Sequence, residues 1–336
     1  MLREEIMYLM QRKDMSEEMT MAAFDKIMGG EVNDVQLSAF LTALSIKGES
    51  IDEITAAAKI MMKHCEKLPN ICESLDIVGT GGDKSGSFNI STASAIVLSA
   101  AGIPVTKHGN RAATSKCGSA DVLEALGVGI DLEPAQSVEM LNKTGFCFLF
   151  ANRYHSAMKH VGKVRRLIGI KTIFNLIGPL SNPASPKYQL MGVFNESWIE
   201  PLACVLHNIG VKNLIVVYGR DGLDEVSLCG ETAACEIIGG QMRRFIITPE
   251  QFGFPRCTKS DLAGGTPEEN AQIIMNILRG ERGHRRNVVV MNCTFAYRTV
   301  HPELCIDDAK KIIEDAIDSD KAFAMLDKLK TCNTNI

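Results

Sequence analysis

Residues 75–92 read LDIVGTGGDKSGSFNIST, and this stretch decides the fold. Its first five residues predict a short buried strand, and residues 90–101 predict a helix. Between them, glycines let the backbone approach an anion closely, and the N–H groups that open a helix can hold phosphate. A plain glycine turn before a capped helix is the alternative. A dinucleotide fingerprint is excluded because it needs glycine at position 84, where this chain has Lys84. A Walker A loop is excluded because it needs lysine at position 87, where this chain has Ser87.

The alternation of strands and helices continues from this stretch towards the C-terminus. Further strands are predicted at residues 103–105, 146–150, 188–193 and 214–218. Helices are predicted at residues 119–126, 135–144, 155–168, 197–209 and 266–278 and in the C-terminal segment. Strands that alternate with helices indicate an α/β domain with a mostly parallel central sheet, here over residues 74–336.

Towards the N-terminus the pattern is helical throughout. Asn33 with Gln36, and Ser50 with Glu53, resemble capping boxes that open two of the helices. We therefore predict a small N-terminal α-helical domain over residues 1–70. Its apolar faces need covering, which indicates an oligomerisation surface.

The composition excludes several classes of protein. Lys and Arg number 36 against 40 Asp and Glu, a net charge of −4, whereas non-specific nucleic-acid binding favours a basic excess. No run approaches the roughly 18 apolar residues that span a bilayer, and Glu4 and Glu5 stand where a secretory signal is basic. The 11 cysteines include no CxxC pair, which argues against a disulfide framework or a zinc site. We expect a cytoplasmic protein that binds neither nucleic acid nor membrane.

Three further clusters carry side chains suited to an anionic ligand. Residues 107–121, KHGNRAATSKCGSAD, follow a predicted strand, at the edge where open α/β sheets bind ligands. Residues 221–225, DGLDE, place adjacent carboxylates after another strand, which suits Mg²⁺. On a helical pattern, Arg165 flanks the apolar face of Val161 and Val164 and could clamp a carboxylate. A solvated basic loop, an acidic turn and a solvated helix face are the respective alternatives.

Together these motifs resemble the anthranilate phosphoribosyltransferase family. The similarity rests, in order, on GTGGD at 79–83, NIST at 89–92, KHGNRA at 107–112, GSAD at 118–121, TIFNLIGPLSNP at 172–183 and DGLDE at 221–225. It implies transfer of the phosphoribosyl group of 5-phosphoribosyl 1-diphosphate (PRPP) to the amine of anthranilate, in tryptophan biosynthesis, with Mg²⁺ as cofactor. It also implies a homodimer joined through the helical domain, to which a segment near 166–182 returns. It leaves open a further partner, the amidotransferase of anthranilate synthase.

The resemblance also assigns roles to individual residues. The catalytic residues would be Lys107, His108 and Asp83, with positioning as the alternative role of His108. The ligands of Mg²⁺ would be Ser91, Asp224 and Glu225. Anthranilate would contact Gly79, Asn110, His155, Arg165 and Gly178. PRPP would contact Gly79, Gly82, Asp83, Ser87, Asn89, Ile90, Ser91, Thr92, Lys107, Gly109, Asn110, Arg111, Ala112, Ala113, Thr114, Ser115 and Ser119.

Two other functions stay open at this stage. A nucleoside phosphorylase of the same fold is one, although the features at 110–111 and 224–225 do not fit it. A same-fold relative that binds nucleic acid through a basic groove is the other, and the net charge of −4 argues against it. The chain departs from the family around Asn152 and at Ser156 and Lys163, since proline is usual near the first and at the other two. These departures bear on how tightly anthranilate is held, and not on the PRPP site.

Overall fold

The computed structural model describes residues 1–69, 71–83, 85–112 and 115–333. Before the first strand come the helices Arg3–Met10 (α1), Glu17–Met28 (α2), Asp34–Lys47 (α3) and Ile51–Lys63 (α4). The capping box predicted for α4 is confirmed, because Ser50 and Glu53 each accept from the other's N–H. At α3, Asn33 caps the helix, but Gln36 does not close a box. Its side chain accepts from the Leu2 N–H at 3.2 Å and joins α3 to the start of α1.

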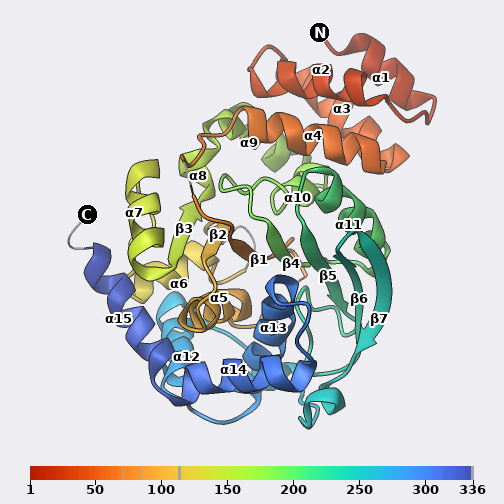
Figure 1. The fold of residues 1–336 in the computed structure, drawn as a ribbon. Helices are drawn as coiled ribbons and strands as arrows, with labels where there is room; N and C mark the ends of the chain where they lie inside the picture. Colours follow the sequence, from red (N-terminus) through yellow and green to blue (C-terminus); the bar gives the residue numbers. More distant parts are fainter. Residues whose placement is uncertain (70, 84, 113–114, 334–336) are drawn as a thin grey trace.

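The strands form a sheet with the order β3-β2-β1-β4-β5-β6-β7 (Figure 1). Neighbours from β3 to β5 pair in parallel, and β6 and β7 extend the sheet antiparallel. The strands are Leu75–Gly79 (β1), Val105–Gly109 (β2), Phe146–Phe150 (β3), Tyr188–Gly192 (β4), Asn213–Gly219 (β5), Thr232–Ile238 (β6) and Gln241–Ile247 (β7). The predicted α/β class, with a small helical domain and a mostly parallel sheet, is confirmed.

Two elements have other bounds in the structure than the sequence predicts. The strand predicted at 103–105 is wrong in its extent, because β2 runs on through Thr106, Lys107 and His108. These polar side chains are buried in the sheet, so a search for apolar residues alone ends the strand too early. The helix predicted over 155–168 is confirmed only from Lys159 onward, because a short helix (α8, Ala151–Tyr154) and a 3-10 turn precede α9 (Lys159–Ile168).

Helices cover both faces of the sheet (Figure 1). Leu190 belongs to the core on the face covered by α5 and α13, and its neighbour Met191 to the core shared with α11 and the N-terminal helices. No described helix is both long and apolar enough to cross a membrane. The remaining helices are Ile90–Ala100 (α5), Ser119–Ala125 (α6), Pro134–Thr144 (α7), Phe174–Ile177 (α10), Ile199–Asn208 (α11), Pro267–Leu278 (α12), His284–Val300 (α13), Ile306–Asp318 (α14) and Lys321–Asn333 (α15).

A later segment of the chain returns to the N-terminal helices. Helix α9 packs on α2 and α3, and α10 packs on α4. An ion pair of 2.5 Å between Lys163 and Asp34 also joins α9 to α3. The segment expected near 166–182 therefore overlaps the end of α9 and all of α10, and the packing begins earlier, with the helix that starts at Lys159.

The strand order reverses between β1 and β4. From β1 the chain moves outward to β2 and β3, whereas β5, β6 and β7 lie on the other side of β4. Open sheets bind ligands in the crevice at the carboxyl ends of the strands where such a reversal occurs. Gly79 and Gly192 end β1 and β4 and are partners in register, so they mark this crevice.

Candidate active site

The loop that follows β5 carries Asp224 and Glu225 over the crevice between β1 and β4. Residues 219–231 are called the carboxylate loop below. Gly79 and Gly192 make room for it, because a Cβ at Gly79 would overlap the Asp224 carboxylate and one at Gly192 would overlap the Asp224 backbone. The Asp224 carboxylate accepts a hydrogen bond of 2.7 Å from the Gly81 N–H. The structure thus brings the carboxylate loop together with the loop between β1 and α5, which is called the glycine-rich loop.

Crowded, buried carboxylates give this place the character of a cation site. Asp224 is 9% exposed and Glu225 is 7% exposed. Burial and the charge of Asp83 raise the pKa of Asp224 to about 7, and burial and the charge of Asp224 raise the pKa of Glu225 to about 8. Asp83 Oδ2 is buried and has no hydrogen-bond partner among the described residues. A divalent cation would relieve this repulsion.

The donor atoms suit Mg²⁺ in particular. Carboxylate and hydroxyl oxygens are the ligands it prefers, and the Ser91 backbone N–H donates to Glu225, which brings the start of α5 beside the carboxylates. Among the described residues, no three His, Cys, Asp or Glu side chains stand close enough to hold a metal by themselves. In proteins, Mg²⁺ usually keeps several waters and takes phosphate oxygens beside one or two carboxylates.

Lys107, a predicted catalytic residue, is buried next to Ser91. It is 2% exposed, and its Nζ donates to the Ile77 carbonyl at 2.7 Å and to Ser91 Oγ at 3.1 Å. Burial lowers the pKa of Lys107, and the nearby carboxylates, Asp76 first, oppose that effect. This side chain therefore ties β1 and β2 to the start of α5.

Ion pairs and hydrogen bonds hold the loop after β2 against α6. The Arg111 guanidinium pairs with Asp121 and Glu124, and Asp121 also accepts from the N–H groups of Ala112 and Gly118 at 2.9 Å and 2.8 Å. The acids of α6 thus neutralise the charge of Arg111 in this structure.

The other predicted PRPP residues differ in how they are held. The hydroxyls of Ser87 and Ser115 bond within their own loops, and that of Ser119, which opens α6, donates to the Asn110 carbonyl at 3.2 Å. The side chains of Ile90 and Thr92 are buried, as that of Lys107 is. The predictions at Ala113 and Thr114 lie outside the described residues.

Two histidines meet where the acceptor residues were expected. The rings of His108 and His155 lie 5.1 Å apart, and both side chains are buried. Burial lowers the pKa of His155 to about 4 and that of His108 well below its usual range, so both are neutral at pH 7. His155 Nε2 lies 2.9 Å from the Ser181 carbonyl, and the Gly178 backbone is within hydrogen-bonding reach of His108. His108 Nε2 has no partner among the described residues.

The other two expected acceptor residues have polar or aromatic neighbours. The Arg165 guanidinium lies 5.4 Å from the ring centroid of Phe174, the first residue of α10, and pairs with no carboxylate within the described parts of the chain. Asn110 donates to the Asn152 side chain at 3.4 Å. One of the departures from the family thus lies directly beside an expected anthranilate contact.

Two asparagines that hold these loops were not predicted as site residues. Asn182 donates to the buried Asp76 carboxylate at 2.8 Å and to the Thr106 carbonyl at 2.7 Å, beside β2. Asn292 of α13 accepts from the Val226 N–H and donates to the Val226 carbonyl, both at 2.9 Å, which fixes the carboxylate loop. Asn182 stands in the 172–183 motif, which could have revealed it, whereas nothing around Asn292 in the sequence sets it apart.

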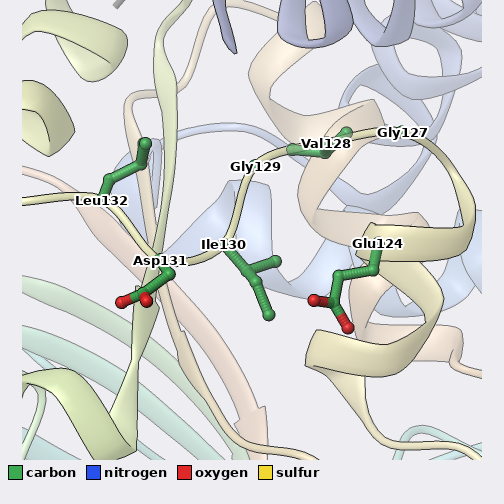
Figure 2. A pocket seen from close by; sticks show the side chains of 7 residues that line it. All are labelled: Glu124, Gly127, Val128, Gly129, Ile130, Asp131 and Leu132. Carbon is green, nitrogen blue, oxygen red and sulfur yellow. The ribbon is translucent and has the colours of Figure 1, made fainter.

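A surface depression of about 390 Å³ lies outside the crevice, where α6 leads to α7. Figure 2 shows Ile130 between the carboxylates of Asp131 and Glu124 in its wall. Glu124 also pairs with Arg111, so this depression borders the loop after β2. None of the residues that line this depression is a predicted site residue.

Comparisons with known proteins agree with this geometry. Residues 3–65 match the model of the glycosyl transferase family, helical bundle domain, and residues 72–323 match that of the glycosyl transferase family, a/b domain. The anthranilate phosphoribosyltransferase of Methanobrevibacter smithii is 51% identical over 98% of both chains, and that of Endomicrobium trichonymphae is 49% identical over 98% of both chains.

Solved structures give the same result. The crystal structure of anthranilate phosphoribosyltransferase from Thermus thermophilus has a TM-score of 0.92 at 37% identity, with 97% of this chain and 98% of that chain covered. The enzyme from Saccharomyces cerevisiae in complex with PRPP and Mg has a TM-score of 0.88 at 29% identity, with 96% and 94% covered. The chain therefore belongs to the glycosyl transferase family with these two domains and, within it, to the anthranilate phosphoribosyltransferases.

Proposed function

We propose that the chain transfers the phosphoribosyl group of PRPP to the amine of anthranilate, giving N-(5-phosphoribosyl)anthranilate and diphosphate in tryptophan biosynthesis. The observation that carries this proposal is the crevice at the β1–β4 reversal, where the glycine-rich loop meets Asp224. Relatives that are about half identical over nearly the whole chain bear the name of this activity. The solved Saccharomyces cerevisiae structure in complex with PRPP and Mg supports the choice of donor and cofactor.

The reaction calls mainly for electrostatic stabilisation. Positive charge develops at ribose C1 while negative charge builds on the departing diphosphate, and fixed charges and dipoles favour such a transition state. Mg²⁺, when bound by Asp224, Glu225 and Ser91, would neutralise charge on the diphosphate. Backbone N–H groups of the glycine-rich loop and the start of α5 would hold the phosphates. Lys107 would help to stabilise the diphosphate, from a position fixed by its bonds to the Ile77 carbonyl and to Ser91 Oγ.

Anthranilate would bind beside the two histidines. Its amine is a neutral nucleophile, so a strong general base is not needed. His108 is neutral, and its unpartnered Nε2 could accept the amine proton or position the acceptor. The guanidinium of Arg165 would hold the carboxylate of anthranilate.

The Arg165→Ala variant tests this acceptor site. We expect the KM for anthranilate to rise more than the KM for PRPP, because only the acceptor would lose a charged contact. Arg166→Ala is the matched control, since Arg166 is exposed on the same helix. Steady-state kinetics with each substrate varied in turn make the measurement, and equal effects on both KM values would remove Arg165 from the acceptor site.

We also propose that two copies of the chain associate through the helical domain. Exposed apolar side chains on α1, α3 and α9 support this, namely Met7, Met10, Val35, Ile46 and Leu167. A cytoplasmic location and an amidotransferase partner stay predictions from the sequence.

The activity is tested by the loss of anthranilate fluorescence when PRPP is supplied, with and without Mg²⁺. We expect turnover that requires the metal. A folded protein that shows no turnover at millimolar substrates would refute the proposal. Phosphate-dependent cleavage of thymidine or uridine would favour a nucleoside phosphorylase instead.

A further inference from the structure

Two cysteines that take no part in the proposed chemistry meet beside the site. Cys229 follows Glu225 in the carboxylate loop, and Cys257 lies in the segment after β7. Their Sγ atoms are 3.6 Å apart, and both are free, partly exposed thiols. We propose that Cys229 and Cys257 close a reversible disulfide that links two walls of the active site.

Each cysteine belongs to a segment that holds one wall. Cys229 continues the loop that carries the carboxylates. On the other side, Leu262 and Gly264 exchange backbone hydrogen bonds of 3.0 Å and 2.9 Å with residues 86–88 of the glycine-rich loop. The Cys257 N–H already donates to the Leu228 carbonyl at 3.2 Å, so the two segments touch where the thiols meet. A covalent bond there would couple the carboxylate loop to the support of the glycine-rich loop.

The chemistry needs a disulfide of low molecular weight, such as oxidised glutathione, as the oxidant. One cysteine thiolate attacks it, forms a mixed disulfide and releases one glutathione thiolate. The second cysteine thiolate attacks the protein sulfur of that mixed disulfide, which forms the Cys229–Cys257 bond and releases the second glutathione. The two protons lost by the cysteines pass to the two released thiolates. A reducing compartment keeps such a pair as thiols, so the bond forms only under oxidising conditions.

Burial of the two thiols slows this exchange. It raises the pKa of Cys257 to about 12 and raises that of Cys229, and the carboxylates of Asp221 and Asp261 act in the same direction on Cys257. Both side chains are therefore neutral thiols at pH 7, and only the thiolate attacks. We expect slow closure that accelerates as the pH rises.

Closure moves the sulfurs from 3.6 Å to a bond length of about 2.05 Å. Because that shift pulls on the carboxylate loop, we expect the KM for PRPP to rise in the oxidised protein, on the order of threefold or more, with recovery on reduction by dithiothreitol. This part of the inference rests on the proposed function. The bond itself does not, because it is detected without any activity.

The experiment treats the full chain with oxidised glutathione, alkylates the remaining thiols and maps the peptides by mass spectrometry. We expect a peptide linked through Cys229 and Cys257, absent from the Cys229→Ser and Cys257→Ser variants. Cys305→Ser is the matched control and should keep the link, because Cys305 is exposed and caps α14, a position that serine also fills. The KM for each substrate is then measured before oxidation, after it, and after reduction.

Two results would overturn the inference. One is glutathione attached singly to these cysteines without a linked peptide. The other is a linked peptide in a protein whose KM for PRPP stays unchanged, which would refute the link between the two walls of the active site although the bond forms. If the reduced protein consumes no anthranilate at all, the proposed function fails, and the linked peptide still decides whether the bond forms.

Discussion

At the scale of single residues, Asp224 joins the metal site to the glycine-rich loop. Replacing it by asparagine removes one of the two adjacent buried carboxylates but keeps an oxygen for the Gly81 N–H. We expect the Asp224→Asn variant to need on the order of tenfold more Mg²⁺ and to show a raised KM for PRPP, since both ligands depend on the same carboxylate. Glu231→Gln is the control, because Glu231 is a partly exposed acid of the same loop that pairs with Arg220. Kinetics at varied Mg²⁺ make the measurement, and unchanged metal dependence would contradict the assignment.

His155 gives the molecule a dependence on pH that can be measured. Burial lowers the pKa of His155 to about 4 from its ordinary value of 6.5, so between these values the unfolded chain binds a proton there that the folded chain does not. The free energy of unfolding therefore falls as the pH falls from 6.5 towards 4, by about 3 kcal/mol from this residue. Urea unfolding at a series of pH values should show a smaller acid loss for His155→Gln. His301→Gln, at a more exposed histidine, should behave as the wild type does.

Some residues of the site can be predicted from the sequence and others cannot, for a physical reason. Asp224 and Glu225 stand out because adjacent acids directly after a strand are a local pattern. The role of Gly192 is not local, since only the folded chain shows that the Asp224 backbone passes over it. The same holds for Asn292, whose partner Val226 is far away in the sequence.

At the scale of elements, the paired ends of β1 and β4 position the carboxylate loop. A Cβ at Gly192 would overlap the Asp224 backbone, so the Gly192→Ala variant has to displace the loop or the strand. We expect a loss of about 1–3 kcal/mol in the free energy of unfolding, together with a raised KM for PRPP. In the control Gly230→Ala the new methyl group meets no atom within 4 Å. Urea unfolding compares the two variants, and equal stabilities would show that the close approach does not constrain the loop.

The antiparallel strands β6 and β7 were not predicted from the sequence. Most of β6 is buried and apolar, whereas β7 exposes Arg243 and Arg244 side by side instead of alternating polar and apolar residues. The alternation of buried and exposed side chains that marks a strand, with a period of two residues, is thus missing from β7. The Gly239-Gly240 turn between two such runs is a hairpin signal that could have revealed the pair. The parallel strands were easier to predict, because their apolar runs stand between helices.

At the scale of the whole molecule, the exposed apolar side chains of the helical domain predict a dimer. Val35 on α3 is 78% exposed, so a charge there would not disturb the fold of one chain. We expect the Val35→Asp variant to elute as a monomer in size-exclusion chromatography with light scattering, at a concentration where the wild type is a dimer. Met242→Asp, at an exposed position on β7, is the control. A Val35→Asp protein that stays dimeric would place the interface elsewhere.

The support of the glycine-rich loop has a consequence for biosynthesis on the ribosome. Phe88 bonds to Leu262, Asn89 accepts from Asn270, and the carboxylate loop is held by Asn292. While the chain is being translated, the N-terminal helices and β1 to β3 can form early, but these bonds need partners made much later. The substrate crevice is therefore assembled only after α13 has left the exit tunnel, and until then a nascent chain carries the glycine-rich loop without the segments that shape it.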